Sequence, residues 1–423
     1  MTSPRLMHAV SRSDLTRVFG RIGLLSFGGP AAQIALMHRA LVEDRHWLDE
    51  AQFLRALSFC MLLPGPEAMQ LATYAGWRLR GMAGGVIAGG LFVLPGALVI
   101  AALALAYAAW GTLPQTAAIL LGVKATVIVV VVQALVRLSQ KALRGQGDVL
   151  LAFSAFAGLY LFNLPFPLVI ALAGLWGALR VPAQPAVPIT SPKTATSWRA
   201  IALWAGLWLV PLPILWISGQ MVLFDLAAFF AKLAVVTFGG AYAVLAYMAQ
   251  EVVQTRGWLS PEAMIDALGL AETTPGPLIL VTQFVGMLTG YAAGGVMMAL
   301  AAGAVTLWMT FVPCFLWIFA AAPHLERLLA VPRLQSALAA ITAAVVGVIA
   351  NLSLWFAMHV VFDDMAAVRL GPVGFDLPLL SSVVPHALGL IALAATLLLF
   401  LKRGIPEVLL ICAAAGYGVS HFI

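Results

Sequence analysis

The sequence has few charges, few cysteines and no long polar stretch. Only 9% of its 423 residues are Asp, Glu, Lys or Arg, whereas a soluble domain carries about 25%. This scarcity argues against a soluble fold. Apolar residues make up 62% of the chain, its mean hydropathy is +1.01, and apolar runs of about 20 residues, enough to cross a bilayer, recur throughout. The composition predicts an all-α polytopic membrane protein.

Sequence signals for metal, nucleotide and redox chemistry are missing. The three cysteines lie far apart with no CxxC spacing, and the seven histidines form no HxxxH or HxxEH pair. No GxxxxGK[ST] motif is present to cradle a nucleotide phosphate. No basic run is interleaved with aromatic residues, as in nucleic-acid-binding proteins. We therefore expect no metal, no cofactor, no nucleic-acid partner and no enzymatic activity.

A duplication organises the chain. FGRIGLLSFGGPAAQIALM at 19–37 aligns with FAKLAVVTFGGAYAVLAYM at 230–248, at an offset of 211 residues. The same offset aligns Pro64-Gly65-Pro66 with Pro275-Gly276-Pro277. A stretch rich in Pro, Ser and Thr, 181–199, separates the copies. We expect three parts: an N-terminal repeat at 1–180, a linker with an unpaired central helix at 181–221, and a C-terminal repeat at 222–423.

The hydropathy pattern predicts about thirteen membrane-spanning helices, six in each copy and one between them. FGG and PGP motifs break some of them, because glycine and proline interrupt a helix. An odd helix between the copies inverts the second copy, an arrangement found in secondary transporters. The sequence leaves open whether each PGP segment crosses the bilayer or turns back. The expected spans are 19–41, 51–79, 84–110, 115–138, 147–162, 165–180, 200–217, 222–249, 262–288, 294–320, 334–361, 379–401 and 405–422.

The distribution of basic residues predicts the orientation, because cytoplasmic segments are enriched in Lys and Arg. With the N-terminus inside and thirteen spans, fifteen basic residues fall in cytoplasmic segments and three, Arg39, Arg45 and Arg369, fall in outer loops. The C-terminus is then periplasmic. The cytoplasmic set is Arg5, Arg12, Arg17, Arg78, Arg80, Lys141, Arg144, Arg180, Lys193, Arg199, Arg256, Arg327, Arg333, Lys402 and Arg403.

Two basic residues at equivalent positions are candidate anion ligands. Arg21 aligns with Lys232, and each lies seven residues before the first glycine of its FGG motif, Gly28 or Gly239. A planar guanidinium and a compact ammonium together suit a tetrahedral oxyanion. The alternative is that both side chains extend to the membrane interface or pair with acids. Charges inside membrane spans are functional candidates by default.

Other polar residues lie near the breaks or deep in a span. Lys124, in LLGVKATVIVVVV, is a third candidate ligand or a counter-ion for Glu67. Glu67 follows the first PGP at a helix start, and Glu272 precedes the second PGP. Each could cap a helix end or, if burial raises its proton affinity, couple anion movement to protons. The uncharged candidate donors are Gln33, Gln70, Thr273, Thr274 and Gln283.

These motifs resemble the chromate ion transporter (CHR) family in its long two-domain form. The matching strings are SFGGP, LPGPEAMQLATYAGW, FVLPG, TFGGAYAVLAYM and GWLSPEAMIDALGLAETTPGPLILVTQFVG. They are long and specific, and the resemblance covers nearly the whole chain. Met69 departs from the expected pattern, where a glutamine is usual. The family positions here are Gly28, Gly29, Pro30, Pro64, Gly65, Pro66, Glu67, Gln70, Gly239, Gly240, Glu272, Pro275, Gly276 and Pro277.

The resemblance implies export of chromate across a bacterial inner membrane, driven by the membrane potential or the proton-motive force, with chromate resistance as the result. The expected partners are chromate, with sulfate as competitor, the lipid bilayer and, in a homodimer, a second copy of the chain. The alternative within transport is an importer of sulfate or another oxyanion that also accepts chromate. A membrane-embedded enzyme using Glu67 and Glu272 as an acid–base pair is disfavoured, because no nucleophile or metal motif accompanies them.

Overall fold

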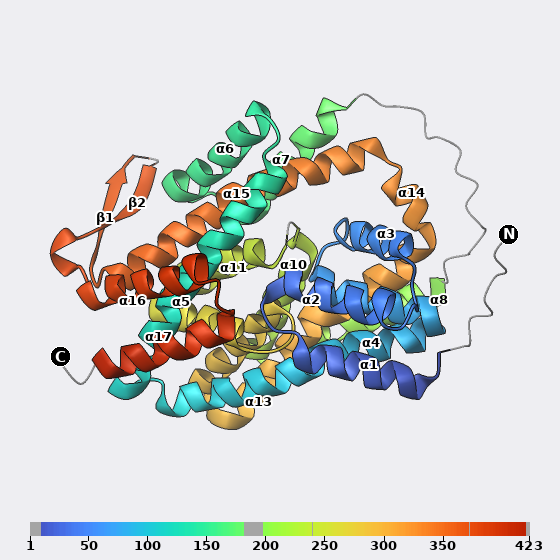
Figure 1. Cartoon of the computed structure of the whole chain (residues 1–423), viewed down its shortest axis with the longest axis horizontal. Helices are drawn as coiled ribbons and strands as arrows, with labels where there is room; N and C mark the ends of the chain where they lie inside the picture. The colour runs from blue at the N-terminus through green and yellow to red at the C-terminus, as the bar shows by residue number, and fades with distance from the viewer. Residues whose placement is uncertain (1–9, 182–197, 239, 372, 420–423) are drawn as a thin grey trace.

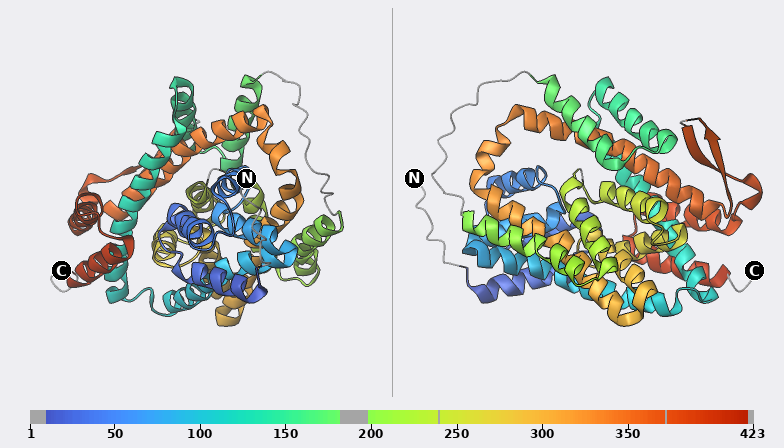
Figure 2. Two further views of the ribbon diagram at one scale, coloured as in Figure 1. Left: turned by 45° about the vertical axis from the view of Figure 1, so that its right-hand side comes forward. Right: turned by 180° about the vertical axis from the view of Figure 1, so that it is seen from behind.

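The computed structural model describes residues 10–181, 198–238, 240–371 and 373–419. Within these ranges the chain is helical apart from one β-hairpin. Five helical segments in the described part are long and apolar enough to cross a membrane, and shorter apolar helices accompany them. Figures 1 and 2 show the N-terminal helices at one end of the molecule and the β-hairpin with the C-terminal helices at the other. The expected all-α membrane class is confirmed.

The helices follow the expected spans closely. Those of the first half are α1 (Arg12–Leu25), α2 (Gly29–His38), α3 (Glu50–Cys60), α4 (Glu67–Trp110), α5 (Pro114–Ala142), α6 (Gln146–Phe162) and α7 (Phe166–Arg180). The central segment forms α8 (Trp198–Leu209) and α9 (Pro211–Ile217). The second half contains α10 (Met221–Val236), α11 (Ala241–Ala249), α12 (Pro261–Thr273), α13 (Val281–Ala321), α14 (Leu325–Leu329), α15 (Pro332–Val361), α16 (Pro385–Ala395) and α17 (Ile405–Val419).

Equivalent helices of the two copies begin in equivalent ways. Asp49 caps α3 in a capping box with Gln52. Ser260, 211 residues later, caps α12 by accepting a hydrogen bond from the backbone of Ala263. Short π-helical turns follow both α2 and α11 at the same offset. The duplication is therefore visible in local structure.

The two longest helices are each two helices joined at a glycine. Gly81 in α4 and Gly295 in α13 have φ of 63° and 69°, a left-handed conformation that glycine adopts without strain. A Cβ atom on Gly76 would lie 2.2 Å from the carbonyl oxygen of Gly84, so residues 67–79 fold back onto the helix that follows. The expected boundaries between 51–79 and 84–110, and between 262–288 and 294–320, lie at these turns.

The segments broken at FGG and PGP also fold back on themselves. The rings of Phe59 and Tyr74, either side of the first PGP, are 5.9 Å apart, and those of Phe229 and Tyr247, either side of the second FGG, are 5.8 Å apart. In a continuous helix these residues would be about 22–27 Å apart at 1.5 Å per residue. Each of these two breaks is therefore the tip of a hairpin. This differs from the single crossing expected over 222–249 and places the two arms of the first PGP segment side by side.

A β-hairpin replaces part of the outer loop expected before residue 379. Strands β1 (Met365–Leu370) and β2 (Val373–Pro378) are antiparallel, with Val368 opposite Phe375. Gly371 turns the chain at a φ of 62°. The hairpin packs on α6, where Tyr160 and Asn163 donate hydrogen bonds to the carbonyl oxygens of β2. The following helix begins at Pro385, later than the expected start of its span.

Replacing Gly76 with valine should prevent the close packing of the two arms of α4. The nearest atoms to an added Cβ are the carbonyl oxygen of Gly84 at 2.2 Å and the Cβ of Ala88 at 2.6 Å. Neither can move aside as the end of a flexible side chain can, so we expect destabilisation of at least about 1–3 kcal/mol. Thermal unfolding in detergent, followed by size-exclusion chromatography, measures it. The matched control is Gly90→Ala in the same helix, where an added Cβ meets nothing within 4 Å. Equal stability of the two variants would contradict the folded-back arm.

Candidate functional site

Two reciprocal backbone hydrogen bonds join the breaks of one half to those of the other. The amide of Gly65 donates to the carbonyl oxygen of Thr237 at 3.0 Å, and the amide of Gly276 donates to that of Ser26 at 2.9 Å. Under the 211-residue offset these are the same pair, because Ser26 corresponds to Thr237 and Gly65 to Gly276. Exchange of one contact between two copies is what a two-fold relation produces. We call these two places the break crossings.

Three buried glutamines surround the break crossings. Gln33 donates to the carbonyl oxygen of Gly276 at 2.6 Å, Gln70 to that of Pro64 at 2.6 Å, and Gln283 to that of Ala97 at 3.1 Å. These bonds fix each amide, because a flipped amide would place oxygen against oxygen. The side-chain oxygens of all three remain buried without a partner in the described part of the chain. They can accept a hydrogen bond from water or from a protonated ligand.

Glycine and proline create the space and the turns at the crossings. Positive φ values occur at Gly28, Gly29, Gly65, Gly240 and Gly276. Gly239 lies outside the described residues. Pro64, Pro66, Pro275 and Pro277 bracket the breaks, where a backbone without regular helical bonds is exposed to a partner. A Cβ on Gly96 of α4 would lie 2.2 Å from the carbonyl oxygen of Pro275, so this helix touches the break directly.

Two of the expected uncharged donors are already engaged. The hydroxyl of Thr273 donates to the carbonyl oxygen of Leu270 at 2.7 Å, and that of Thr274 to Ala271 at 2.9 Å. Both bonds satisfy carbonyls at the end of α12, as threonine side chains commonly do near helix ends. An anion at this break would meet lone pairs from these residues unless the hydroxyls rotate.

Arg21 and Lys232 lie on exposed faces of α1 and α10. Neither forms an ion pair among the described residues. The ammonium of Lys232 sits over the ring of Tyr247, 5.7 Å from its centroid. Each lies five residues before a crossing residue, Ser26 or Thr237, which corresponds to about 7.5 Å along a helix. The two cations therefore lie at equivalent positions relative to the two crossings, and neither contacts a crossing residue.

Lys124 has a partner that the sequence analysis did not identify. Its ammonium lies 3.0 Å from Oδ1 of Asp266 in α12, and the hydroxyl of Tyr107 in α4 donates to Oδ2 at 2.8 Å. The suggestion that Lys124 is the counter-ion of Glu67 is therefore wrong, because its ammonium is paired with Asp266. A lone lysine in an apolar span needs a counter-ion, and the only sequence signal for it was a second unassigned charge, Asp266, in the other copy.

The two break carboxylates have different surroundings. Glu67 is the first residue of α4, as predicted, and it has no hydrogen-bond or ion-pair partner in the described chain. Lys141 lies close enough for its charge to act on Glu67. Glu272 is buried near the end of α12 and accepts one hydrogen bond, from the hydroxyl of Tyr242 at 2.9 Å. A small apolar cavity adjoins it, lined by Val127, Val131, Leu245, Leu268, Leu352 and Phe356.

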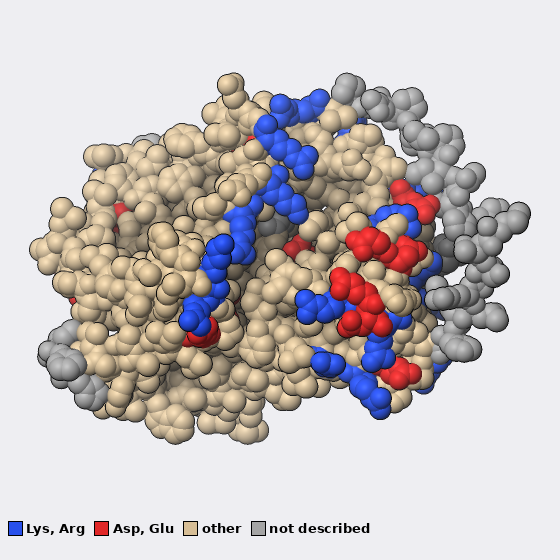
Figure 3. Space-filling view, in the orientation of Figure 1, with Lys and Arg blue, Asp and Glu red and all other residues tan. Residues whose placement is uncertain are grey.

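Basic side chains form a diagonal stripe across one face of the molecule, and a cluster of mixed charge covers the end with the N-terminal helices (Figure 3). Two arginines lie where the ends of α6, α7 and α15 meet. Arg180, at the end of α7, lies beside Gly147 at the start of α6, and Arg333, at the start of α15, donates a hydrogen bond to the carbonyl oxygen of Val181 at 3.3 Å.

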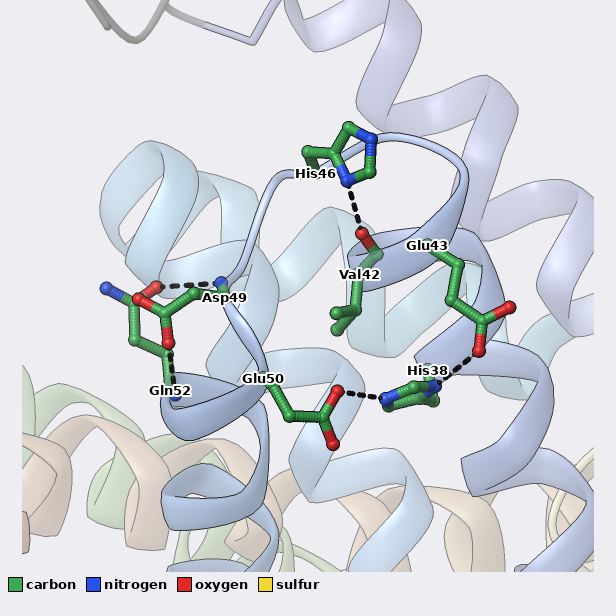
Figure 4. Close-up of polar contacts among 7 residues, drawn as sticks. All are labelled: His38, Val42, Glu43, His46, Asp49, Glu50 and Gln52. Carbon is green, nitrogen blue, oxygen red and sulfur yellow. Dashed lines mark hydrogen bonds and ion pairs between the residues drawn. The ribbon is translucent and has the colours of Figure 1, made fainter. Parts of the chain in front are cut away.

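A histidine links the end of α2 to the start of α3 at this charged end. His38, whose side chain is about one-quarter exposed, ends α2, and its ring nitrogens lie 3.1 Å from Glu43 and 2.7 Å from Glu50 at the start of α3 (Figure 4). The hydrogen bond with Glu50 raises the pKa of His38 above its usual value. Protonated His38 therefore holds two segments together.

A separate cavity of about 560 Å³ lies between the β-hairpin, α6, α11 and α15. Its polar lining includes Asn163, Gln250, Asn351, Arg369 and Asp376. Both an arginine and a carboxylate face it, so it has no clear preference for an anion.

Comparisons with known proteins agree on one family. A family model described as chromate transporter matches residues 13–178 and 224–419. A probable chromate transport protein of Synechococcus elongatus is 31% identical over 419 residues, 98% of each chain. Chromate transport proteins of Cupriavidus metallidurans and Pseudomonas aeruginosa are 29% and 32% identical, covering 83% and 80% of this chain and 84% and 80% of theirs. No solved structure matches. The resemblance drawn from the sequence is confirmed.

Replacing His38 with glutamine should lower stability mainly in acid. The pKa of His38 is raised in the folded protein, so its protonation stabilises the fold. This contribution to the free energy of unfolding is fully present below the pKa of about 6.5 in the unfolded chain, and it is lost as pH rises through the folded pKa. Because the carboxylates of Glu43 and Glu50 are exposed, we expect the variant to lose about 0.5–1 kcal/mol of unfolding free energy at most. Thermal unfolding over a pH series measures it.

The control for this prediction is His46→Gln, since the ring of His46 contacts only the carbonyl oxygen of Val42, at 2.7 Å. A His38 effect that grows with rising pH would contradict the assignment.

Proposed function

The chain belongs to the chromate transporter family, and we propose that it is a secondary transporter that exports chromate across the inner membrane and so confers chromate resistance. The observation that carries this proposal is the pair of break crossings. Broken backbone at membrane depth is tolerated where it is buried in protein or lines a watery path. Secondary transporters place such breaks at the interface of two repeats and bind ions there.

We propose an inverted-repeat topology in which the FGG and PGP segments are re-entrant hairpins. The fold-back at Phe59–Tyr74 and at Phe229–Tyr247 supports hairpins in one copy each, and the repeat relation extends them to the other. Nine helices then cross: the second arms of α4 and α13, α5, α6, α7, α8 with α9, α15, α16 and α17. This replaces thirteen simple crossings and keeps the N-terminus inside and the C-terminus outside.

The distribution of basic residues supports this topology better than the simple one. Re-entrant hairpins move Arg39 and Arg45 to the inner side and Arg256 to the outer side. Basic residues then number sixteen inside against two outside, compared with fifteen against three. The domain division at 1–180, 181–221 and 222–423 also follows, with each repeat contributing two hairpins and four crossings.

The membrane potential is a sufficient driving force for export. Moving one charge through 100 mV is worth about 2.3 kcal/mol, so a dianion leaving a negative interior gains about 4.6 kcal/mol. Arg21 and Lys232 attract the oxyanion towards the crossings, beside which the side chains of Gln33 and Gln70 lie. Glu67, unpaired at a helix start, repels a bare anion and admits it when protonated.

Import of sulfate or another oxyanion with protons is the second candidate. Its support is Glu272, a buried carboxyl whose single hydrogen-bond partner in the described chain is the neutral Tyr242. Such a group favours its protonated form. Sulfate is in either case the proposed competitor of chromate, because both are tetrahedral dianions. A homodimer remains a proposal about assembly.

Neutralising Arg21 or Lys232, the basic residues at equivalent positions of the two copies, should greatly reduce transport. We expect Arg21→Gln and Lys232→Gln each to reduce chromate flux in proteoliposomes by at least about tenfold. A tenfold loss corresponds to about 1.4 kcal/mol, the size expected for one lost contact between a cation and the oxyanion. A potassium–valinomycin potential drives the flux, with and without excess sulfate. Arg403→Gln, in an exposed ion pair with Glu407, is the control and should transport normally. Absence of chromate flux together with proton-driven sulfate flux would favour the importer.

Replacing Glu67 with glutamine should flatten the pH dependence of flux. The variant carries a permanently uncharged side chain at the first break, so it cannot alternate between repelling and admitting the anion. Initial rates of potential-driven chromate flux over a pH series measure the effect. Glu326→Gln, at an exposed position on α14, is the control. A wild-type pH profile in Glu67→Gln would remove Glu67 from the path.

A further inference from the structure

The group of Lys124, Asp266 and Tyr107 joins both halves of the protein at a buried position. Lys124 is on α5 and Tyr107 on α4, whereas Asp266 is on α12, the arm that leads into the second PGP break. The carboxylate uses its two oxygens separately: Oδ1 lies 3.0 Å from the ammonium and Oδ2 accepts from the phenol at 2.8 Å. Phe284 of α13 packs edge-on against Tyr107, with ring centroids 5.5 Å apart.

Few other charges act on this group. Glu262 lies one turn earlier on α12, and His359 of α15 is near Glu262. Lys124 is therefore balanced by Asp266 at contact distance, and the pair is neutral as a unit. Lys124 is also the more exposed of the two side chains, with 16% exposed against 7% for Asp266.

Displacing Asp266 from Lys124 has an electrostatic consequence. An oxyanion that binds the ammonium leaves the carboxylate without its counter-ion, and an unpaired buried charge is strongly unfavourable. Uptake of one proton by Asp266 removes that charge. The resulting acid keeps its hydrogen bond from Tyr107 on one oxygen and can donate from the other to the bound oxyanion.

We propose that Lys124 binds the transported oxyanion and that Asp266 takes up a proton in the same step. The oxyanion replaces the carboxylate at the ammonium, the proton from water bonds to Oδ1 of Asp266, and no other bond changes. Tyr107 holds the carboxyl group in place in both states. The site therefore binds anion and proton together, and it returns to the Lys124–Asp266 ion pair when both leave.

This inference rests on the proposed function and deepens it by naming the coupling residue. Glu67 acts on access to the crossings, whereas Asp266 sets how many protons accompany each bound anion. The anion carries one charge less with its proton, so outward movement of a dianion and a proton is still favoured by the potential, by about 2.3 kcal/mol per 100 mV.

Calorimetric titration of the full chain in lipid nanodiscs tests the proposal. Sulfate or chromate is added at an alkaline pH where both are dianions, in two buffers with different heats of ionisation, so that the difference in heat gives the protons taken up. For the wild type we expect about one proton for each oxyanion bound. Asp266→Asn, which keeps the acceptor for Tyr107, should bind the oxyanion with no proton uptake.

Two further variants separate the proposal from a purely structural role of the pair. Lys124→Gln should bind oxyanion at least about tenfold more weakly. The reversed pair Lys124→Asp/Asp266→Lys keeps the ion pair for folding but moves the ammonium to the less accessible position, so its chromate flux should be lost. Glu251→Gln, from the ion pair with Arg256, is the matched control and should take up protons as the wild type does.

Three results would overturn the proposal: proton uptake that persists in Asp266→Asn, wild-type binding without proton uptake, or full transport by the reversed pair. A wild-type protein that neither binds nor transports any oxyanion would instead refute the proposed function itself. The two failures are therefore distinguishable.

Discussion

The structure depends on satisfying backbone groups that are exposed where helices are broken inside the apolar core. An unpaired amide or carbonyl at membrane depth is costly, so each break needs a partner. The partner of each half is the other half: Gly65 bonds to Thr237, and Gly276 bonds to Ser26. In this chain each copy of the repeat therefore completes a break of the other.

Glycine makes the crossings possible, and the helices around them follow. At Gly96 and Gly65 an added Cβ would meet a backbone oxygen or a glutamine side chain closer than 3 Å. Close approach brings α4 and α13 into contact along their second arms, where Gly85 faces Phe319 and Gly89 faces Phe315. The contacting residues run in opposite directions along the two arms. This antiparallel pair forms the scaffold on which the breaks are held.

The sequence predicted much of the fold, because the repeat and the hydropathy pattern are local signals. The approximate helix positions and the breaks followed from them. Hydropathy could not distinguish a crossing helix from a hairpin over 222–249, since both bury apolar residues at the same spacing. The contact between Phe229 and Tyr247 that separates them depends on the tertiary fold. The β-hairpin at 365–378 was missed because an apolar span was expected to begin close to it.

The candidate site was predictable only in part. The alignment of the two copies identified Arg21 and Lys232 as candidates, and the positions of the PGP motifs identified Glu67, Gln70 and Glu272. Asp266 was missed because it lies 142 residues from Lys124 and has a basic residue, Arg55, at the equivalent position of the first copy. Ion pairs between copies leave no periodic signal. Such a pair is found only when the helices that carry it are placed in space.

The proposed topology and the position of the crossings within the membrane depend on whether the broken segments are re-entrant hairpins. Single cysteines at positions 44 and 255, two equivalent and exposed positions at the ends of the π-helical turns after α2 and α11, test this in a background without the three native cysteines. Labelling intact cells with a membrane-impermeant maleimide should modify position 255 and leave position 44 unmodified until the membrane is permeabilised. The reverse pattern would mean that the FGG segments cross the membrane, and would contradict the account.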